Sequence, residues 1–299
     1  MRKYILTFFK GLAMGAADVI PGVSGGTIAF LTGIYSELLN SIKSISFNNL
    51  KLLLRGRFKE FSDAINLKFL VSVAGGILIS IFSLARLMQY LLVHQPIPLW
   101  SFFMGLIGAS AIYVLKDIKK WTVADIISLF AGIAVAAWIC LVSPSQTTEA
   151  YWFVFISGVI AICAMILPGI SGSFILLLMG KYAFIMKAVT DLNIPVLIIF
   201  AAGAAIGIIS FSHFLTWLLK KYYKPTLCVL AGFMIGSLVK VWPWKRVIDE
   251  ASHIDRPVLP GQFETITGEP AQLGLALLFI AIGFSIVFII EFMAKSLKK

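Results

Sequence analysis

Apolar segments of close to 20 residues recur along this chain, at about 69–92, 98–115, 122–142, 196–219, 226–242 and 272–292. A helix of that length crosses the roughly 30 Å hydrocarbon core of a bilayer, whereas the strands of a membrane barrel would appear as shorter alternating runs. Because 60% of the 299 residues are hydrophobic and only 13% are charged, a water-soluble domain is excluded. We therefore predict an all-α polytopic membrane protein.

Two stretches interrupt this apolar pattern with proline, glycine and serine: "DVIPGVSGGT" at 18–27 and "MILPGISGSF" at 165–174. At an offset of 147 positions, identical residues recur in the two regions: Pro21, Gly22, Ser24, Gly25, Leu31, Gly33 and Tyr35 meet Pro168, Gly169, Ser171, Gly172, Leu178, Gly180 and Tyr182. At an offset of 127, "GLIGAS" from Gly105 meets "GFMIGS" from Gly232. These matches predict an internal duplication.

The basic residues indicate how the two halves are oriented, because basic loops stay on the cytoplasmic side. When each interrupted region is treated as a re-entrant hairpin, most lysines and arginines gather on the side of both chain termini. Each half then has one hairpin and three spans, an odd number of crossings, so the halves are inverted-topology repeats. We predict a first repeat at 1–142, with a hairpin at 4–40 and an interfacial helix at 43–66. The second repeat is expected at 151–299, with a hairpin at 151–190, and both form one integrated membrane domain.

The remaining composition excludes several classes of partner. The net charge of +11 is explained by membrane orientation and attraction to lipids, so we expect no nucleic acid partner. Cys140, Cys163 and Cys228 stand singly in apolar segments without metal-ligand spacing, which predicts no disulfide framework, no metal site and no cofactor. The basic, apolar N-terminus is similar to a signal peptide, but Lys10 interrupts its apolar run, so we expect it to be retained.

The two interruptions predict a binding cavity. Proline and glycine unwind a helix, and unwound backbone survives at membrane depth only inside protein or along a hydrated cavity. Helices that restart after the breaks present backbone N–H groups, positive dipole ends and serine hydroxyls, a combination that suits an anion. The alternative is a pair of turns that bind no ligand. The candidate binding residues here are Asp18, Pro21, Gly22, Val23, Ser24, Gly25, Gly26, Thr27, Pro168, Gly169, Ile170, Ser171, Gly172 and Ser173.

Two charged residues within the apolar pattern are candidates for function. Asp18 directly precedes the first break, where a carboxylate can relay protons or cap a helix. Arg86, inside a predicted span, can bind a phosphate as a bidentate fork, reach the membrane interface or neutralise Asp18. Lys181, Lys187 and Glu37 at the hairpin ends are expected mainly to set orientation, and His213 to be a packed or hydrogen-bonded residue.

The stretches "GLAMGAADVIPGVSGGTIAFLTGIYSEL", "LPGISGSFILLLMGKY" and "GSLVKVWPWK" resemble the bacterial polyprenyl-phosphate transporter family, long known only as a domain of unknown function. The resemblance covers nearly the whole chain. It implies a non-enzymatic function, the transport of undecaprenyl phosphate from the outer to the cytoplasmic leaflet of the bacterial cytoplasmic membrane. That movement returns the lipid carrier of cell-wall precursors for reuse.

The physical expectations are compatible with such a substrate. A phosphate monoester carries about −1.5 to −2 charges near pH 7. Moving it inward works against an inside-negative potential by about 2.3 kcal/mol per charge per 100 mV, which favours a positive companion. Proton coupling through Asp18 is our hypothesis.

Two alternatives remain open. A carrier or channel for a small anion shares every physical argument, but its site would open to water, whereas a lipid carrier needs a groove that opens sideways to the bilayer. The run Gly22-Val23-Ser24-Gly25 also resembles the motif of rhomboid-type intramembrane serine proteases, with His213 as the membrane-embedded base. Against the protease, the motif occurs twice and His213 has no counterpart. Oligomeric state is left open.

Overall fold

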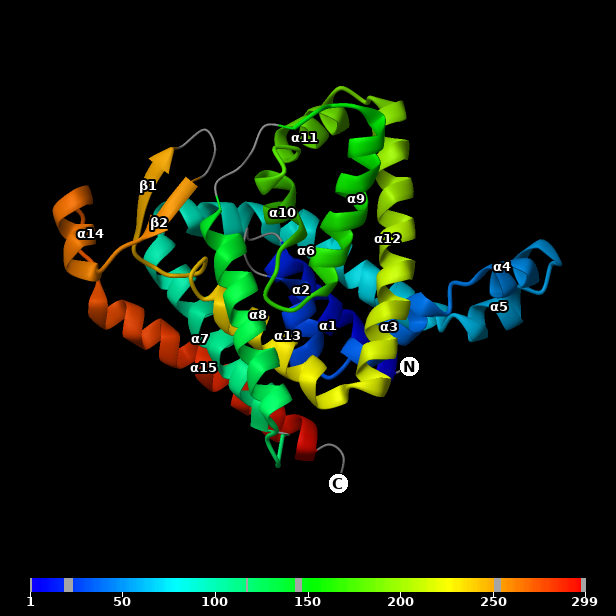
Figure 1. Ribbon diagram of the computed structural model, residues 1–299, viewed down its shortest axis with the longest axis horizontal. Coiled ribbons are helices and arrows are strands. Elements are labelled where there is room, and N and C mark those ends of the chain that lie inside the picture. Colours follow the sequence, from blue (N-terminus) through cyan, green and yellow to red (C-terminus); the bar gives the residue numbers. More distant parts are fainter. Residues whose placement is uncertain (1, 19–23, 117, 143–146, 250–253, 297–299) are drawn as a thin grey trace.

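The protein is a helical assembly with one small sheet (Figure 1). The structure, a computed structural model, describes residues 2–18, 24–116, 118–142, 147–249 and 254–296. Among these, three helices are by themselves long and apolar enough to cross a bilayer: α7 (Pro96–Lys116), α8 (Val123–Leu141) and α12 (Ile194–Lys221). This architecture agrees with the polytopic membrane protein that the apolar segments predict.

The first interrupted region forms three helices. These are α1 (Arg2–Asp18), the short α2 (Gly25–Leu31) and α3 (Tyr35–Lys43). Ser24 begins α2 as its N-cap, with its side chain accepting a hydrogen bond from the Gly26 backbone N–H. Gly33, at φ +71°, allows the left-handed turn between α2 and α3. Lys10 of α1 donates a 2.7 Å hydrogen bond to the Thr32 carbonyl at the end of α2, so this lysine has a hydrogen-bond partner within the first hairpin.

The segment expected as one interfacial helix at 43–66 consists of two helices, α4 (Phe47–Leu54) and α5 (Phe58–Ala64). Gly56, at φ +71°, lies in the turn that separates them, and a left-handed residue cannot continue a helix. The two helices project from the body of the molecule, at the right of Figure 1. Leu54 and Phe58 are 85% and 66% exposed, so this projection presents apolar side chains outward.

The second interrupted region repeats the elements of the first. Its helices are α9 (Tyr151–Ile166), α10 (Gly172–Leu178) and α11 (Tyr182–Thr190), with a 111° bend between α10 and α11. Adding 147 to the bounds of α2 and α3 gives the bounds of α10 and α11. The turn bonds repeat as well: Gly33 N donates to Phe30 O, and Gly180 N to Leu177 O.

The long helices that follow also recur. Adding 127 to the bounds of α6 (Leu67–His94) gives those of α12, and α7 and α13 (Tyr223–Ser237) begin at positions related by the same offset. The last element is α15 (Leu273–Ser296). These helices begin and end within a few residues of the spans that hydropathy predicts, except that α13 stops at Ser237 and is followed by a turn.

Helices pack in pairs, and glycine lies at each of these interfaces. The pairs are α1 with α6, α9 with α12, α8 with α13 and α7 with α15. A Cβ on Gly11 of α1 would lie within 3.0 Å of the Val73 backbone on α6, and one on Gly207 of α12 within 2.9 Å of the Val159 backbone on α9. Small residues allow such close approach of helices in a membrane, where packing replaces the hydrophobic effect. Helices α7 and α13 meet in the core, where Ile107 and Met234 are fully buried.

A feature that hydropathy does not predict follows α13. Strands β1 (Lys245–Asp249) and β2 (Ile254–Pro257) form an antiparallel hairpin, followed by α14 (Pro260–Thr267). The all-α prediction is therefore wrong for this segment, although the rest of the described chain is helical. In Figure 1 the hairpin and α14 lie at the upper left, away from both termini. Two indole N–H groups hold the segment: Trp242 donates to Val258 O and Trp244 to Ala271 O, both at 2.8 Å.

Candidate functional site

The two interruptions, more than 140 positions apart in sequence, lie in direct contact. Gly169 N donates a 2.9 Å hydrogen bond to Thr27 Oγ1. Ser24 Oγ lies 3.2 Å from Leu167 O and 3.3 Å from Met165 O, within bonding distance of either carbonyl. The Tyr35 hydroxyl donates to Ile166 O at 3.2 Å. The structure thus brings the first and second breaks to one point, and backbone groups that unwinding leaves unpaired are satisfied from the opposite half.

The first break is closed by its own acid. Gly25 N donates a 2.7 Å hydrogen bond to Asp18 Oδ1, so the carboxylate at the end of α1 caps the helix that restarts after the break. A Cβ at Gly25 would collide with this carboxylate, and one at Gly26 would lie 2.6 Å from Ile166 O. Close approach to backbone therefore requires glycine at position 26, whereas a side chain at position 25 would displace the Asp18 carboxylate. Three candidates of this break, Pro21, Gly22 and Val23, lie outside the described residues.

The second break differs in how its serines are used. Ser171 is the N-cap residue of α10, yet its side chain makes no capping bond and instead lies 2.9 Å from Ser173 Oγ. Gly169 has φ +86°, and a Cβ there would lie 2.7 Å from Phe233 O. Pro168, Ile170 and Gly172 are buried beside them. Among the described residues of the first break, the N–H groups of Gly25, Gly26 and Thr27 are taken up by internal bonds, whereas the paired hydroxyls of the second break can still bond a further group.

The other charged candidates are dispersed. Arg86 belongs to α6, but its side chain lies outside the described residues. Glu37 pairs with Lys3 at 2.9 Å near the end of the first hairpin, an exposed contact of the kind that holds elements in place. Lys181 is 1% exposed, donates to Thr147 O at 3.0 Å and stacks over Phe184, so it holds a loop to the second hairpin. Lys187 lies on α11 and has an interaction partner.

The arrangement around Ser24 does not support a serine protease. Ser24 is 1% exposed, and its hydroxyl is engaged with Gly26 N and the carbonyls at the end of α9. The Nδ1 atom of His213 lies 2.9 Å from Ile209 O, one turn earlier in its own helix. A nucleophile needs a base within hydrogen-bond reach and access to substrate, and these contacts supply neither.

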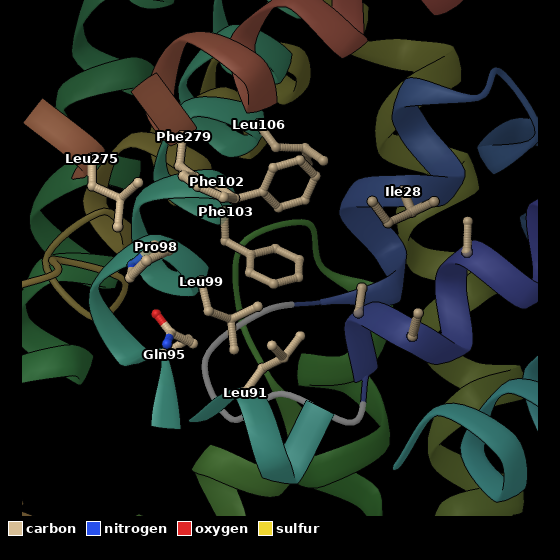
Figure 2. Close-up of a pocket in the computed structure, with 13 residues that line it drawn as sticks. Ile28, Leu91, Gln95, Pro98, Leu99, Phe102, Phe103, Leu106, Leu275 and Phe279 are labelled. Carbon is tan, nitrogen blue, oxygen red and sulfur yellow. The ribbon is translucent and has the colours of Figure 1, made fainter. Parts of the chain in front are cut away.

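An apolar groove of about 660 Å³ begins at the first break (Figure 2). Ala16 and Ala17 of α1 and Ile28 of α2 form one wall. Gln95, between α6 and α7, and residues of α6, α7 and α15 complete it: Leu91, Pro98, Leu99, Phe102, Phe103, Leu106, Leu275 and Phe279. In Figure 2 the phenyl rings of Phe102 and Phe103 lie across the space from Ile28. Gln95 is exposed and Leu91, Phe102, Leu275 and Phe279 are half-buried, so the groove reaches the apolar surface. An apolar chain fits such a lining better than a hydrated solute does.

A buried charge cluster, which we call the lysine pair, contacts Trp100 of α7 and was missed from the sequence. Lys240 and Lys245 both face Asp255 of β2: Lys240 Nζ donates to Asp255 Oδ1 at 2.7 Å, and Lys245 Nζ lies 3.4 Å from Oδ2. The lysine side chains are 9% and 11% exposed. The signal was present in "VKVWPWK", which sets two lysines among apolar and aromatic residues just after a span.

Aromatic rings hold both ammonium groups. Lys240 Nζ lies 4.6 Å from the Phe174 ring centroid at the start of α10, and Lys245 Nζ lies 3.6 Å from that of Trp100 on α7. Burial, with a further contribution from Lys240, lowers the pKa of Lys245 to about 8, although Asp255 acts in the opposite direction. Burial raises the pKa of Asp255, but the two lysines outweigh it and hold that pKa below its usual value.

A small cavity connects the lysine pair with the second break. Its lining includes Gly169, Ile170 and Ser171 of the break, Phe174 of α10 and Lys240. Its volume is about 10 Å³, enough for no more than one water molecule. The second break therefore faces a positive side chain at close range, in a space that is shut in this structure.

The sequence has relatives of known name. The family described as undecaprenyl phosphate translocase-like matches residues 14–255. A polyprenyl-phosphate transporter of Vibrio cholerae is 46% identical over 301 residues, covering 97% of this chain and 96% of the relative. A polyprenyl-phosphate transporter of Staphylococcus aureus is 34% identical over 256 residues, covering 80% and 86%. No solved structure matches.

Proposed function

Because this chain belongs to the undecaprenyl phosphate translocase-like family, we propose that it moves undecaprenyl phosphate from the outer to the cytoplasmic leaflet of the bacterial cytoplasmic membrane. That step returns the carrier lipid for cell-wall synthesis. The contact between the two breaks, beside an apolar groove, carries the proposal. It supplies one place where a polar head group can pass the middle of the protein while its tail stays in an apolar environment.

The lining of the groove favours a lipid substrate over a small anion. Its lining is almost entirely hydrocarbon, with Gln95 as the polar exception, so it has little to offer a hydrated ion. A prenyl chain in this lining keeps the apolar surroundings that it has in the bilayer, whereas a hydrated ion would lose its water there. Since the groove starts at Ala17 and Ile28, a lipid lying in it would bring its head group to the first break.

The proposed mechanism uses two inverted repeats. The recurrence of element bounds at offsets of 147 and 127 supports a duplication, and so does the packing of α1 on α6 and of α9 on α12. Inverted repeats with discontinuous helices meeting near the midplane are typical of secondary transporters, in which one repeat moves against the other around the site. In this proposal both termini are cytoplasmic, and the β1–β2 hairpin lies on the outer side.

Proton coupling through Asp18 is part of the proposal. Its carboxylate lies at the end of α1, bonded to the first residue of α2, where protonation would weaken the bond that closes the break. A proton moving inward with the phosphate offsets part of the electrical cost of about 2.3 kcal/mol per charge per 100 mV. Arg86 is proposed as a second phosphate contact.

The experiment is a leaflet-resolved assay in proteoliposomes that contain undecaprenyl phosphate. Accessibility of the phosphate to an impermeant phosphatase is followed with the wild-type protein, with empty vesicles and with Ser24→Ala, Ser171→Ala and Arg86→Gln. We expect the wild type to exchange the lipid between leaflets faster than empty vesicles and the variants to be slower. Equal rates with and without the wild-type protein would disprove the function.

A further inference from the structure

In the part of the chain that the structure describes, the lysine pair has two ammonium groups and one carboxylate partner. Lys240 and Lys245 share one carboxylate, that of Asp255. Among the described residues, the buried Lys245 Nζ has no hydrogen-bond partner and relies on a 3.4 Å ion pair and the Trp100 ring. A buried ammonium that lacks full pairing costs free energy, so an evolved site of this kind points to a missing anion.

The groups around the pair suit a phosphate monoester. Asp255 approaches from β2, Cys140 from α8, Phe174 from α10 and Trp100 from α7. Ser171 and Lys240 both line the small cavity, so a residue with a hydroxyl donor and a residue with an ammonium group lie at one place. A phosphate monoester carries about −1.5 to −2 charges and several acceptor oxygens, and therefore matches two lysines better than one carboxylate does.

The position of the pair connects it to both other parts of the candidate site. Trp100, under Lys245, directly follows Leu99 of α7, which lines the apolar groove. Gly169 and Ser171 of the second break lie in the wall of the small cavity beside Lys240. The pair thus lies beside the second break through Lys240, and one residue along α7 from the groove wall through Trp100.

Asp255 occupies the position of the anion in this structure. Its side chain is 24% exposed, more than either lysine, so it covers the pair from the solvent side. The cavity beside Lys240, at about 10 Å³, is too small for a phosphate in this structure. An entering phosphate must take the place of the carboxylate, and β2 must shift with Asp255.

We propose that Lys240 and Lys245 form an entry site for a phosphate monoester, and that Asp255 is an internal counter-ion which the phosphate displaces. The identification of that monoester as a polyprenyl phosphate rests on the proposed function. The exchange explains why the pair is kept charged and buried without a complete set of partners. It also gives the β1–β2 hairpin a role, since the hairpin holds the competing carboxylate over the site until a substrate arrives.

Binding to the full-length protein in lipid nanodiscs tests this inference. The probe is radiolabelled farnesyl phosphate, with farnesol and inorganic phosphate as competitors. Lys240→Gln and Lys245→Gln should each weaken probe binding by about tenfold or more, since a charge-assisted hydrogen bond is lost. Asp255→Asn should tighten it several-fold, because the competing charge is gone while the side-chain shape is kept. Lys119→Gln, at an exposed position, serves as the matched control.

The outcomes are separable. Lysine variants that bind like the wild type, or an Asp255→Asn protein that remains folded and binds more weakly, would overturn the inference. Lys240→Arg and Lys245→Arg should retain binding, which shows that the glutamine variants act through charge and not through misfolding. Competition by inorganic phosphate would identify the phosphate group alone as the ligand, whereas competition by neither competitor would identify the prenyl phosphate as a whole. Leaflet exchange tests the proposed function, whereas probe binding tests the role of the lysine pair.

Discussion

Gly169 donates its backbone hydrogen bond to the hydroxyl of Thr27, at 2.9 Å, and so joins the two interruptions of the chain. Thr27 is fully buried, and its partner lies in a turn that an ordinary residue would adopt only with strain. A buried donor that loses its acceptor costs about 1–3 kcal/mol, so this bond matters for both stability and the geometry of the crossing.

Thr27→Val should destabilise the protein by about 1–3 kcal/mol, because the Gly169 N–H would be left unsatisfied by a side chain of similar shape. Thr27→Ser retains the hydroxyl and should cost less. Unfolding of the purified proteins in detergent, followed by circular dichroism against denaturant, measures the difference. A valine variant as stable as the serine variant would contradict the role of this bond.

Gly169→Ala should be more harmful than Gly33→Ala. Both glycines have positive φ, which costs an alanine roughly 1–2 kcal/mol. At Gly33 a new methyl group meets nothing within 4 Å, whereas at Gly169 it would lie 2.7 Å from Phe233 O. Gly169→Ala therefore adds a backbone clash to the conformational strain that both variants share. Melting temperatures of the two variants, compared under one set of conditions, test the order.

Filling the apolar groove should slow lipid transport. Ala16→Phe places a ring in the groove wall near the first break, and we expect the rate of leaflet exchange to fall on the order of tenfold, with farnesyl phosphate affinity at the lysine pair less affected. Val135→Phe, at a position 46% exposed on α8, is the control for added bulk. If both variants transport at equal rates, the groove does not hold the prenyl chain.

Phosphate binding should depend on pH on the alkaline side through Lys245. With a pKa lowered to about 8, this lysine loses its charge as pH rises through that value, and affinity should fall there. On the acid side, the phosphate gains a proton below about pH 6 and binds less strongly. Lys245→Arg stays charged throughout and should abolish the decline above pH 8. Farnesyl phosphate binding curves between pH 5.5 and 9.5 provide the measurement. If the affinity of the arginine variant falls above pH 8 as that of the wild type does, the role of Lys245 is refuted.

Asp18→Asn tests proton coupling. The asparagine oxygen can still accept the hydrogen bond from Gly25 N, but the side chain can no longer exchange a proton. We expect the variant to fold normally, to transport more slowly and to lose its response to an imposed pH gradient. The assay is leaflet exchange in proteoliposomes with and without the gradient. A wild-type rate that ignores the gradient would itself reject the coupling.

Much of the helical architecture was accessible from the sequence because the bilayer imposes length and composition on every span. The offset of 147 between Pro21 and Pro168 correctly anticipates the repeated bounds of α2, α3, α10 and α11. The prediction of a single helix at 43–66 failed to account for Gly56, whose left-handed backbone ends α4. One glycine in an amphipathic pattern is weak information, since its conformation depends on neighbouring contacts.

The site was predicted only in part, for a physical reason. Proline and glycine predict where a helix breaks, but not which groups satisfy the freed backbone. Helix capping was one of the roles that the sequence offered for Asp18, and its carboxylate accepts from Gly25 N, whereas the contact of Ser24 with Leu167 could not be foreseen. The lysine pair was missed because basic residues after a span indicate orientation by default. Its assembly depends on Asp255, which returns from the β1–β2 hairpin, a segment with no strong hydropathy signal.

The glycine interfaces limit how this protein can change shape. Where Gly11 meets Val73 and Gly203 meets Phe155, main chain lies against main chain, with no rotatable side chain between them to absorb sliding. Each of these packed helix pairs is therefore expected to move as one rigid unit. Conformational change is then confined to the connections between these helix pairs. The hydrogen-bonded contact of the two breaks is one of these connections. We expect a relative movement of the helix pairs to open or shut that contact while each helix keeps its shape along its length.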